Sequence, residues 1–335
     1  MKILILGGTQ FLGVHLVEAA LQRGHTVTIF NRGQTRPELF PPVEHLQGDR
    51  DGDLRALEGR RWDAVIDTSG YVPRIVKASA QLLAAADEHY TFISTINVYA
   101  DPTVIGLDEQ SPLATLADET VEEVNGTTYG PLKVLCEQAV QAAFPNRALI
   151  IRPGLIVGPR DATCRFTYWP HRLAQGGDVL APDHQDQPVQ IIDVRDLAAW
   201  TIQMVEARQV GVYTATGPDD ALTFGQLIQQ CQAVSGHHDR IVWVGEAFLQ
   251  EKGVAPWVEL PLWIPSGDGP AGLLSVNNHK AIQSGLAFRP LIQTIQDTLA
   301  WDAAHPEELA KSGGLKPERE QELLQEWAVR SKEEH

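Results

Sequence analysis

A tyrosine and a lysine four residues apart are the pair in this sequence most able to do chemistry. Tyr129 and Lys133 form a Y-x-x-x-K pattern, and residues four apart lie on one face of a helix. An ammonium beside a phenol favours the phenolate, so we expect Lys133 to lower the pKa of Tyr129. Such a tyrosine could act as an acid or a base near neutral pH. The pattern is short and recurs by chance, so its surroundings must support it.

A second candidate is a hydroxyl group placed just after an apolar run. Ser94-Thr95-Ile96-Asn97-Val98-Tyr99 follows a predicted strand, and catalytic hydroxyls belong at the carboxyl ends of parallel strands. Thr95 could donate a hydrogen bond to a substrate oxygen while Tyr129 moves the proton. The alternative is that Thr95 only packs at the end of its strand.

A glycine-rich turn links the first apolar run to the first helical pattern. It reads Gly7-Gly8-Thr9-Gln10-Phe11-Leu12-Gly13. Glycines let the backbone approach a pyrophosphate, and the helix N-terminus points N–H groups at the anion. The turn therefore predicts a dinucleotide site with contacts from Gly7, Thr9, Gln10, Phe11 and Leu12. Gln10 stands where a glycine is usual; its side chain could donate to a phosphate or ribose, or point to solvent.

The residues after the second strand bear on the choice between NAD and NADP. An NAD site uses an Asp or Glu there to bind the ribose, whereas this chain has Asn31-Arg32-Gly33. Arg32 can pair with a 2′-phosphate and Asn31 can bond to it without repulsion. We expect NADP(H), with NAD as the second choice; the alternative is that Arg32 is a solvated loop residue. Further cofactor contacts are expected from Asp49, Arg50, Thr68, Gly70, Lys133, Pro153 and Ile156.

The elements that must position these residues alternate between strand and helix. We expect strands at 3–6, 27–30, 43–46, 64–67, 91–94 and 148–152, and helices at 11–23, 72–86 and 129–143. This order predicts an α/β fold with a Rossmann-type, doubly wound parallel sheet. Later helices are expected at 194–207, 223–234, 291–304 and 315–335, with a loop at 257–272. The predicted parts are a dinucleotide-binding domain (1–152), a lobe for substrate that partly returns to the sheet (153–310) and a helical tail (311–335).

The composition of the chain limits the classes of partner that it is expected to bind. The net charge of −16 repels phosphate backbones and anionic lipids, so neither nucleic acid nor membrane is expected. The cysteines, Cys136, Cys164 and Cys231, are too few and too scattered for a zinc pattern and are expected to be free thiols. His237-His238-Asp239 is interpreted as a polar turn, so no metal is expected. The chain shows no secretion signal and no membrane span, which favours a cytoplasmic monomer or homodimer with a small-molecule substrate.

Together these motifs resemble the extended short-chain dehydrogenase/reductase family, also called the NAD-dependent epimerase/dehydratase family. The resemblance covers about residues 1–305 and is similar in particular to an atypical subgroup with a G-G-T-x-F-L-G turn, which includes isoflavone-reductase-like and chloroplast stem-loop-binding proteins. It also rests on Arg152-Pro153-Gly154, on Val157-Gly158-Pro159, on the run from Asp193 to Ala198, and on Phe288-Arg289-Pro290 before Trp301.

The resemblance implies an NAD(P)-dependent oxidoreductase or epimerase in which Thr95, Tyr129 and Lys133 are catalytic. It places Pro153 to Ile156 at the nicotinamide and the substrate between the sheet and the later lobe. The substrate would be a small carbonyl or hydroxyl compound or a sugar nucleotide. Candidate substrate residues are Tyr99, Arg160, Tyr168, Trp169, His171 and Arg195, each of which could equally serve packing or the surface.

One departure from the family pattern bears on the reaction. Dehydratases of the family carry Asp-Glu directly after the catalytic threonine, whereas this chain has Ile96 and Asn97. Neither side chain can do general acid–base work, so dehydration is disfavoured and reduction and epimerisation remain. The RNA-binding relatives suggest a nucleic-acid-binding protein as an alternative, and an NADP-sensing protein without turnover is another.

Overall fold

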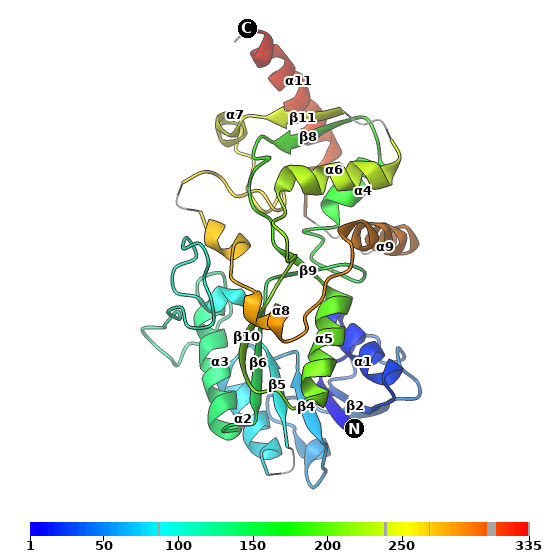
Figure 1. The fold of residues 1–335 in the computed structure, drawn as a ribbon, viewed down its shortest axis with the longest axis vertical. Helices are drawn as coiled ribbons and strands as arrows, with labels where there is room; N and C mark the ends of the chain where they lie inside the picture. The colour runs from blue at the N-terminus through cyan, green and yellow to red at the C-terminus, as the bar shows by residue number, and fades with distance from the viewer. Residues whose placement is uncertain (86–87, 238–239, 268, 307–312, 334–335) are drawn as a thin grey trace.

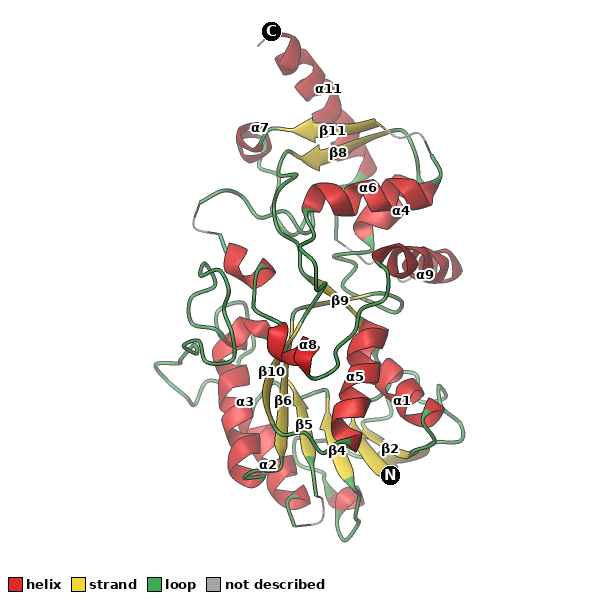
Figure 2. Ribbon diagram, in the orientation of Figure 1, coloured by secondary structure: helices red, strands yellow, loops and turns green. Residues whose placement is uncertain are grey.

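The structure is a computed structural model, and it describes residues 1–85, 88–237, 240–267, 269–306 and 313–333. Figure 1 shows two lobes stacked along the longest axis, with the N-terminus in one and the C-terminus at the far end of the other. The lobe with the N-terminus is a sheet covered by helices on both faces, and the other lobe is mainly helical (Figure 2).

The first lobe is built on a parallel sheet in the order β10-β6-β5-β4-β1-β2-β3. Its strands are β1 (Lys2–Leu6), β2 (Thr26–Asn31), β3 (Glu44–Gln47), β4 (Ala64–Asp67), β5 (Tyr90–Ile93), β6 (Ala148–Pro153) and β10 (Gly211–Ala215). Every pairing between neighbours is parallel. The chain reverses its direction of winding at β1, and in such sheets ligands bind at that point, beyond the carboxyl ends of the strands.

Helices cover the sheet because the first strand is apolar on both faces. Ile3 and Ile5 of β1 pack in one core cluster with α1 (Phe11–Gln22) and α5 (Val194–Glu206). Leu4 and Leu6 point to the other face, toward α2 (Pro73–Leu83) and α3 (Tyr129–Ala143). A strand buried on both faces is typical of a doubly wound parallel sheet, so the predicted fold class is confirmed.

The second lobe surrounds a separate core. Its members are α4 (Tyr168–Ala174), β8 (Asp178–Pro182), α6 (Phe224–Ser235), β11 (Arg240–Val244), α7 (Glu246–Glu251), α9 (Leu291–Ala304) and α11 (Pro317–Glu333). Trp169 is fully buried there, and its Nε1 donates to the carbonyl oxygen of Pro261 at 2.7 Å. Between the lobes lie the pair β7 (Leu155–Val157) and β9 (Ile191–Asp193), and α8 (His279–Gln283). Short 3-10 helices span Arg55–Leu57, Ile96–Val98 and Ala271–Leu274.

All the helices and strands expected from the sequence are confirmed, with ends shifted by up to three residues. The expected helix at 72–86 ends at Leu83, and the expected tail helix begins at Pro317. The last residues predicted for those two helices, 86 and 334–335, lie outside the described residues, as do His238 and Asp239 of the predicted polar turn. The sequence analysis missed β7 to β11 and α4, α7 and α8, all of them short and all but β10 outside the main sheet.

Candidate active site

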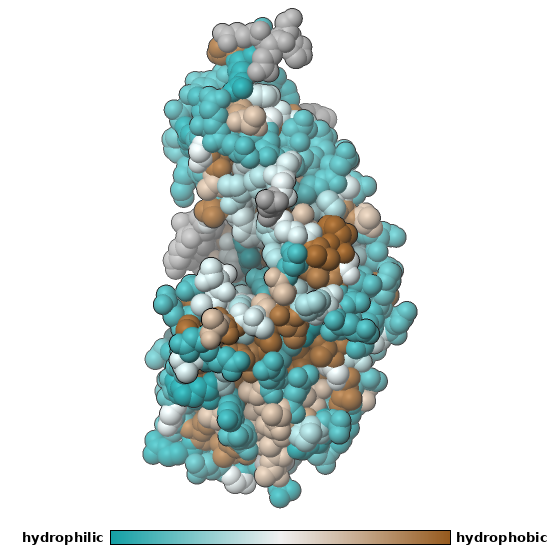
Figure 3. All heavy atoms as spheres, turned by 90° about the vertical axis from the view of Figure 1, so that its left-hand side faces the viewer, coloured by the Kyte–Doolittle hydropathy of each residue, from teal (hydrophilic) through white to brown (hydrophobic). Residues whose placement is uncertain are grey.

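A cavity of about 1220 Å³ lies at the carboxyl ends of the sheet strands. Its wall combines the glycine turn, the segments after β2, β3, β4 and β5, the start of α3, and residues from the second lobe. Figure 3 shows a mainly hydrophilic surface on one side of the molecule, with the apolar residues that reach it gathered mostly around the middle. The predicted catalytic and cofactor-binding residues, apart from Gly70, therefore line one space large enough for a dinucleotide and a substrate.

The glycine turn has the geometry that close approach to an anion requires. Gly7 and Gly8 have φ values of 114° and 94°, which side chains rarely adopt. A Cβ on Gly13 would lie 2.8 Å from the backbone nitrogen of Gly8, so the start of α1 packs directly on the turn. The side chain of Gln10 makes no capping hydrogen bond to α1, and N–H groups at an uncapped helix start can face a phosphate. These features fit a dinucleotide pyrophosphate.

Two residues predicted to contact the adenosine, Asn31 and Arg32, lie on the cavity wall, but only the side chain of Arg32 is exposed. Asn31 is committed to the turn: its Nδ2 donates to the carbonyl oxygen of Gly7 at 3.0 Å, and its Oδ1 accepts from the backbone N–H of Gly33 at 2.8 Å. Arg32 is exposed on the wall, and its carbonyl oxygen accepts from Gln47. A guanidinium in that position is accessible to a 2′-phosphate.

Arg50 was expected to contact the cofactor, but its guanidinium is paired with a buried carboxylate. Its Nη1 and Nη2 donate to the two carboxylate oxygens of Asp67 at 2.7 and 2.8 Å, and Nη2 also donates to Ser79 at 2.7 Å. Tyr90 donates to the same carboxylate at 2.8 Å. The guanidinium of Arg50 thus neutralises a fully buried aspartate beneath the cavity. The neighbouring Asp49 and Thr68 also line the cavity, as predicted.

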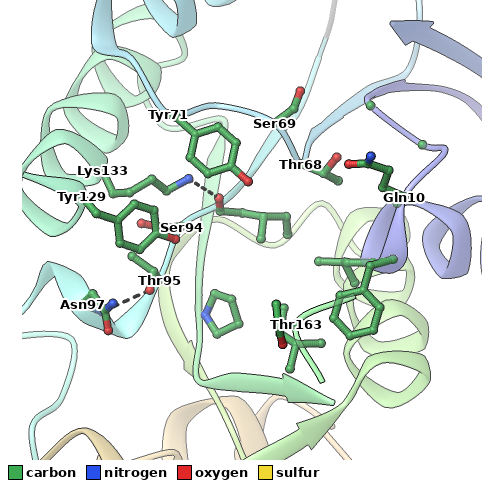
Figure 4. Close-up of a pocket in the computed structure, with 18 of the residues that line it drawn as sticks. Gln10, Thr68, Ser69, Tyr71, Ser94, Thr95, Asn97, Tyr129, Lys133 and Thr163 are labelled. Atoms are coloured by element: carbon green, nitrogen blue, oxygen red, sulfur yellow. Dashed lines mark hydrogen bonds between the residues drawn. The ribbon is translucent and has the colours of Figure 1, made fainter. Parts of the chain in front are cut away.

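The predicted catalytic residues come together on one side of the cavity (Figure 4). Tyr129 begins α3, and Thr95 follows β5. Their approach depends on Gly130, where a Cβ would lie only 2.0 Å from the carbonyl oxygen of Asn97. Thr95 Oγ1 accepts a hydrogen bond from the backbone N–H of Asn97 at 3.2 Å, which leaves the hydroxyl proton available to donate.

The expectation that Lys133 lowers the pKa of Tyr129 is wrong in this structure. Burial raises the pKa of Tyr129, and the Thr95 hydroxyl opposes that shift. The ammonium of Lys133 instead donates to the carbonyl oxygens of Gly70 and Ile93, both at 2.7 Å. The lysine therefore joins the loop after β4 to the end of β5, and Tyr129 is a neutral phenol at physiological pH.

Burial also changes the pKa of Lys133. The side chain is 3% exposed, and desolvation lowers its pKa to about 8. Its Nζ lies 4.1 Å from the ring centroid of Phe92 and 5.4 Å from that of Tyr71, so the charge is partly stabilised by aromatic faces.

Pro153, at the end of β6, and Ile156, in β7, were expected at the nicotinamide end, and both line the cavity. Gly154 lies between them, where a Cβ would approach Thr216 Oγ1 to 2.3 Å. Gly70 contributes the carbonyl oxygen that holds Lys133, and a Cβ at that position would lie 2.5 Å from the ring of Phe92.

The candidate substrate residues do not reach this cavity. Within the described part of the chain, its lining includes none of Tyr99, Arg160, Tyr168, Trp169, His171 and Arg195. Their side chains have other partners: Tyr99 bonds to Thr214 at 2.7 Å, Arg160 lies over Trp301, Tyr168 stacks edge-on against Trp169, His171 bonds to Asp302, and Arg195 pairs with Asp193 and Asp297. Tyr168, Trp169 and His171 belong to α4 of the second lobe, whereas Tyr99 bonds to β10 of the main sheet and Arg195 lies at the start of α5.

Other residues occupy the places that those candidates were expected to fill. The second lobe and its connections contribute Thr163, Arg165, Trp257, Ile264, Pro270, Leu273 and Leu274. Tyr71 enters from the loop after β4 with its ring 6.4 Å from that of Tyr129, and Figure 4 shows it beside Lys133. Its place just beyond a strand end could have signalled Tyr71, whereas nothing local marks residues 257–274.

The described residues contain no group of three or more His, Cys, Asp or Glu side chains arranged to hold a metal ion. The three cysteines are buried free thiols, as predicted. No helix in the described ranges is both long enough and apolar enough to cross a membrane.

Comparison with known sequences finds relatives of moderate identity. The chain is 27% identical over 253 residues to the chloroplast stem-loop binding protein of 41 kDa b from Arabidopsis thaliana, covering 70% of this chain and 63% of that protein. It is 31% identical over 181 residues to 2-alkyl-3-oxoalkanoate reductase from Stenotrophomonas maltophilia, covering 48% and 52%. A ceramide reductase from Caulobacter vibrioides is 25% identical over 260 residues, with 72% of each chain covered. The chain thus spans less than two thirds of the first two relatives.

A solved structure shares the fold. The Bordetella bronchiseptica enzyme WbmG, solved in complex with NAD, superposes with a TM-score of 0.67 at 19% identity, covering 91% of this chain and 94% of that one. Residues 3–215 match the NAD dependent epimerase/dehydratase family. That span holds the glycine turn, the main sheet, Thr95, Tyr129 and Lys133, and the chain therefore belongs to the NAD-dependent epimerase/dehydratase family.

Proposed function

We propose that the chain is an NADP(H)-dependent oxidoreductase or epimerase that acts on a carbonyl or hydroxyl group, with Tyr129 as the acid/base. The observation that carries the proposal is the meeting of the glycine turn, Thr95, Tyr129 and Lys133 around one cavity. Each motif is weak alone, but their order and their shared location satisfy the geometric test for an active site.

In the direction of reduction, Tyr129 donates its proton to the substrate oxygen. Its raised pKa keeps the phenol protonated at physiological pH, as a general acid must be. Thr95 donates a hydrogen bond to the same oxygen and stabilises the negative charge that develops there. The bound dinucleotide supplies or accepts the hydride.

Lys133 has one donor left for the cofactor. Its ammonium has three N–H groups, and two of them are used by Gly70 and Ile93. The third is available to a hydroxyl of the nicotinamide ribose. In this role Lys133 positions the cofactor and the loop after β4, and Tyr129 alone moves the proton.

The preference for NADP(H) rests on Arg32. Titration of the purified protein with NADPH and NADH, followed by fluorescence, tests it directly. We expect Arg32→Ala to weaken NADPH binding by about tenfold or more and to leave NADH binding within about twofold, because only NADPH carries the 2′-phosphate. Arg55→Ala is the matched control, since Arg55 is an exposed arginine paired with Asp53. Equal losses for both cofactors in Arg32→Ala would contradict the preference.

Reduction and epimerisation both suit the residues after Thr95, whereas dehydration does not, because Ile96 and Asn97 carry no acid or base. The names of two relatives, a 2-alkyl-3-oxoalkanoate reductase and a ceramide reductase, favour reduction. Mass spectrometry of protein purified without added cofactor separates the two reactions. An empty site with turnover of NADPH on carbonyl compounds supports a reductase, and retained near-stoichiometric NAD would support an epimerase.

The stem-loop binding relative gives one observation in favour of RNA binding. The net charge of −16 opposes it, because binding to a phosphate backbone needs clustered cations. A stem-loop RNA retained by the protein at physiological salt, and released as salt rises, would favour that function over turnover.

A further inference from the structure

We propose that the substrate is a largely apolar carbonyl compound with a single carboxylate, and that Arg165 binds this carboxylate. The inference deepens the proposed function and rests on it. It starts from the part of the cavity that faces Tyr129 from the second lobe, which differs in character from the part that fits the dinucleotide.

The wall in that region is apolar. Ile264 and Leu274 are buried, and Trp257, Pro270 and Leu273 stand beside them on the cavity. They belong to the segment from 257 to 274, which comes from the lobe opposite the glycine turn. Aliphatic and aromatic walls gain free energy by covering apolar substrate surface and offer little to a sugar ring with many hydroxyl groups.

Among the described lining residues that the second lobe and its connections contribute, Arg165 is the one cation. Arg165 is half-buried on the cavity wall between β7 and α4, and its Nε donates to Thr163 Oγ1 at 3.2 Å. Figure 4 places Thr163 across the cavity from Tyr129 and Lys133. Burial raises the pKa of Tyr129, and the positive charge of Arg165 is among the groups that oppose this shift, so the guanidinium lies within electrostatic reach of the phenol.

Arg165 differs from Lys133, which is buried, and from Arg50, which is paired, because it is only half-buried and forms no ion pair with the described residues. Arg50 is neutralised by Asp67, and Lys133 is held by two carbonyl oxygens. No carboxylate of the described residues lies within ion-pair distance of Arg165, and Asp161 directs one carboxylate oxygen to Thr163. A guanidinium with free N–H groups matches the two oxygens of a carboxylate.

The charges around the cavity favour a substrate with one negative charge over a substrate with several. A second hollow, of about 530 Å³, shares Ile264 with the cavity and is lined by Asp183 and Asp186. A nucleoside diphosphate that reached this hollow would meet carboxylates, which repel phosphate groups. A monocarboxylate would satisfy Arg165 and keep its apolar body against the 257–274 segment.

Turnover of matched substrates tests the proposal. The substrates are 3-oxooctanoate and its methyl ester, with NADPH, and the variants are Arg165→Gln and, as a control at a surface arginine, Arg240→Gln. We expect wild type to prefer the acid and Arg165→Gln to raise KM for the acid about 10- to 100-fold, with kcat and the ester little changed, since one charged pair is lost. Equal use of acid and ester by wild type, or equal losses on both in Arg165→Gln, would overturn it.

Binding without turnover separates this proposal from the proposed function. Octanoate, methyl octanoate and UDP-glucose are titrated into wild type and Arg165→Gln by calorimetry in the presence of NADP. Binding of octanoate that needs Arg165 supports the carboxylate site even if no carbonyl compound is reduced. UDP-glucose binding more tightly than octanoate, or octanoate binding equally well to Arg165→Gln, would overturn the carboxylate site whether or not the protein reduces carbonyl compounds.

Discussion

Lys133 and Ile93 are joined by a 2.7 Å hydrogen bond in which the buried ammonium donates to the carbonyl oxygen at the end of β5. Together with the bond to Gly70, it commits two of the three N–H groups of the ammonium to backbone carbonyl oxygens. The charge is buried without a carboxylate partner, so desolvation governs its titration.

The first prediction concerns stability and pH. The pKa of Lys133 falls from 10.5 to about 8 on folding, so above pH 8 the unfolded chain binds more protons than the folded one. The free energy of unfolding should then rise with pH, by at most about 1.4 kcal/mol per unit between pH 8 and 10.5. Urea unfolding of wild type and Lys133→Met from about pH 7 to about pH 10 measures this. The difference in unfolding free energy between the two proteins should be constant below pH 8. Above pH 8, wild type should gain stability relative to Lys133→Met. A difference that stays constant over the whole range would contradict the burial of the charge.

A second prediction follows from the raised pKa of Tyr129. The phenol stays protonated up to alkaline pH, so kcat/KM for reduction should be nearly flat from about pH 6 to about pH 7.5, below the pKa of about 8 at which Lys133 loses the proton that it offers to the cofactor. Oxidation of the product alcohol needs the phenolate and should speed up by about tenfold per pH unit over the same range. Initial rates in both directions measure this. Reduction that declines with a midpoint near neutral pH would show that the pKa is lowered after all.

The third prediction concerns Gly13. A Cβ there would lie 2.8 Å from the Gly8 backbone nitrogen, so Gly13→Ala must displace the turn or the start of α1. We expect a loss of about 1–3 kcal/mol in unfolding free energy and a loss of cofactor affinity. Gly126→Ala is the control, because a Cβ at that position has no atom within 4 Å. Cofactor titration and thermal unfolding of both variants measure the effect, and equal behaviour of the two would show that close packing at Gly13 is unimportant.

A fourth prediction concerns the ion pair between Glu137 and Arg152, whose side chains are each 3% exposed. Ser94 donates to the same carboxylate at 2.5 Å, so the pair anchors the end of β5 next to Thr95. Glu137→Leu leaves a buried guanidinium unpaired and should cost about 3–5 kcal/mol. Replacing both residues with leucine should recover most of that loss. Chemical unfolding of the single and double variants decides the matter, and a double variant no more stable than Glu137→Leu would contradict the interpretation.

Much of the fold of the first lobe could be predicted because short stretches of its sequence mark where each strand and helix begins and ends. Apolar runs that end in glycine or hydroxyl residues marked the strand ends, and the turn from Gly7 to Gly13 marked the start of α1. The candidate catalytic residues followed from the same rule, since parallel strands bring their carboxyl ends to one edge of the sheet. The relative orientation of these side chains did not follow from the sequence. The hydrogen bonds from Lys133 to two backbone carbonyl oxygens are seen only in the folded structure.

The substrate side could not be predicted for a different reason. Arg165 and Leu274 are 109 positions apart in the sequence and line the cavity together only because the second lobe folds over the sheet. Tyr168 and Arg195 had equally suitable chemistry, but Tyr168 packs within that lobe and Arg195 pairs with Asp193 and Asp297. Pairings at such separation leave no periodic signal in one sequence, so residue type alone selected the wrong candidates.

The most direct measurement is a comparison of two phenols that share the cavity. Tyr129→Phe and Tyr71→Phe each remove one hydroxyl, and the two rings lie 6.4 Å apart. In single-turnover assays with a reducible carbonyl compound, Tyr129→Phe should lose about 100- to 10,000-fold in rate, with cofactor affinity nearly unchanged. Tyr71→Phe should retain most of the wild-type rate. Wild-type rates in Tyr129→Phe, or the large loss in Tyr71→Phe instead, would contradict the assignment of Tyr129 as the proton donor.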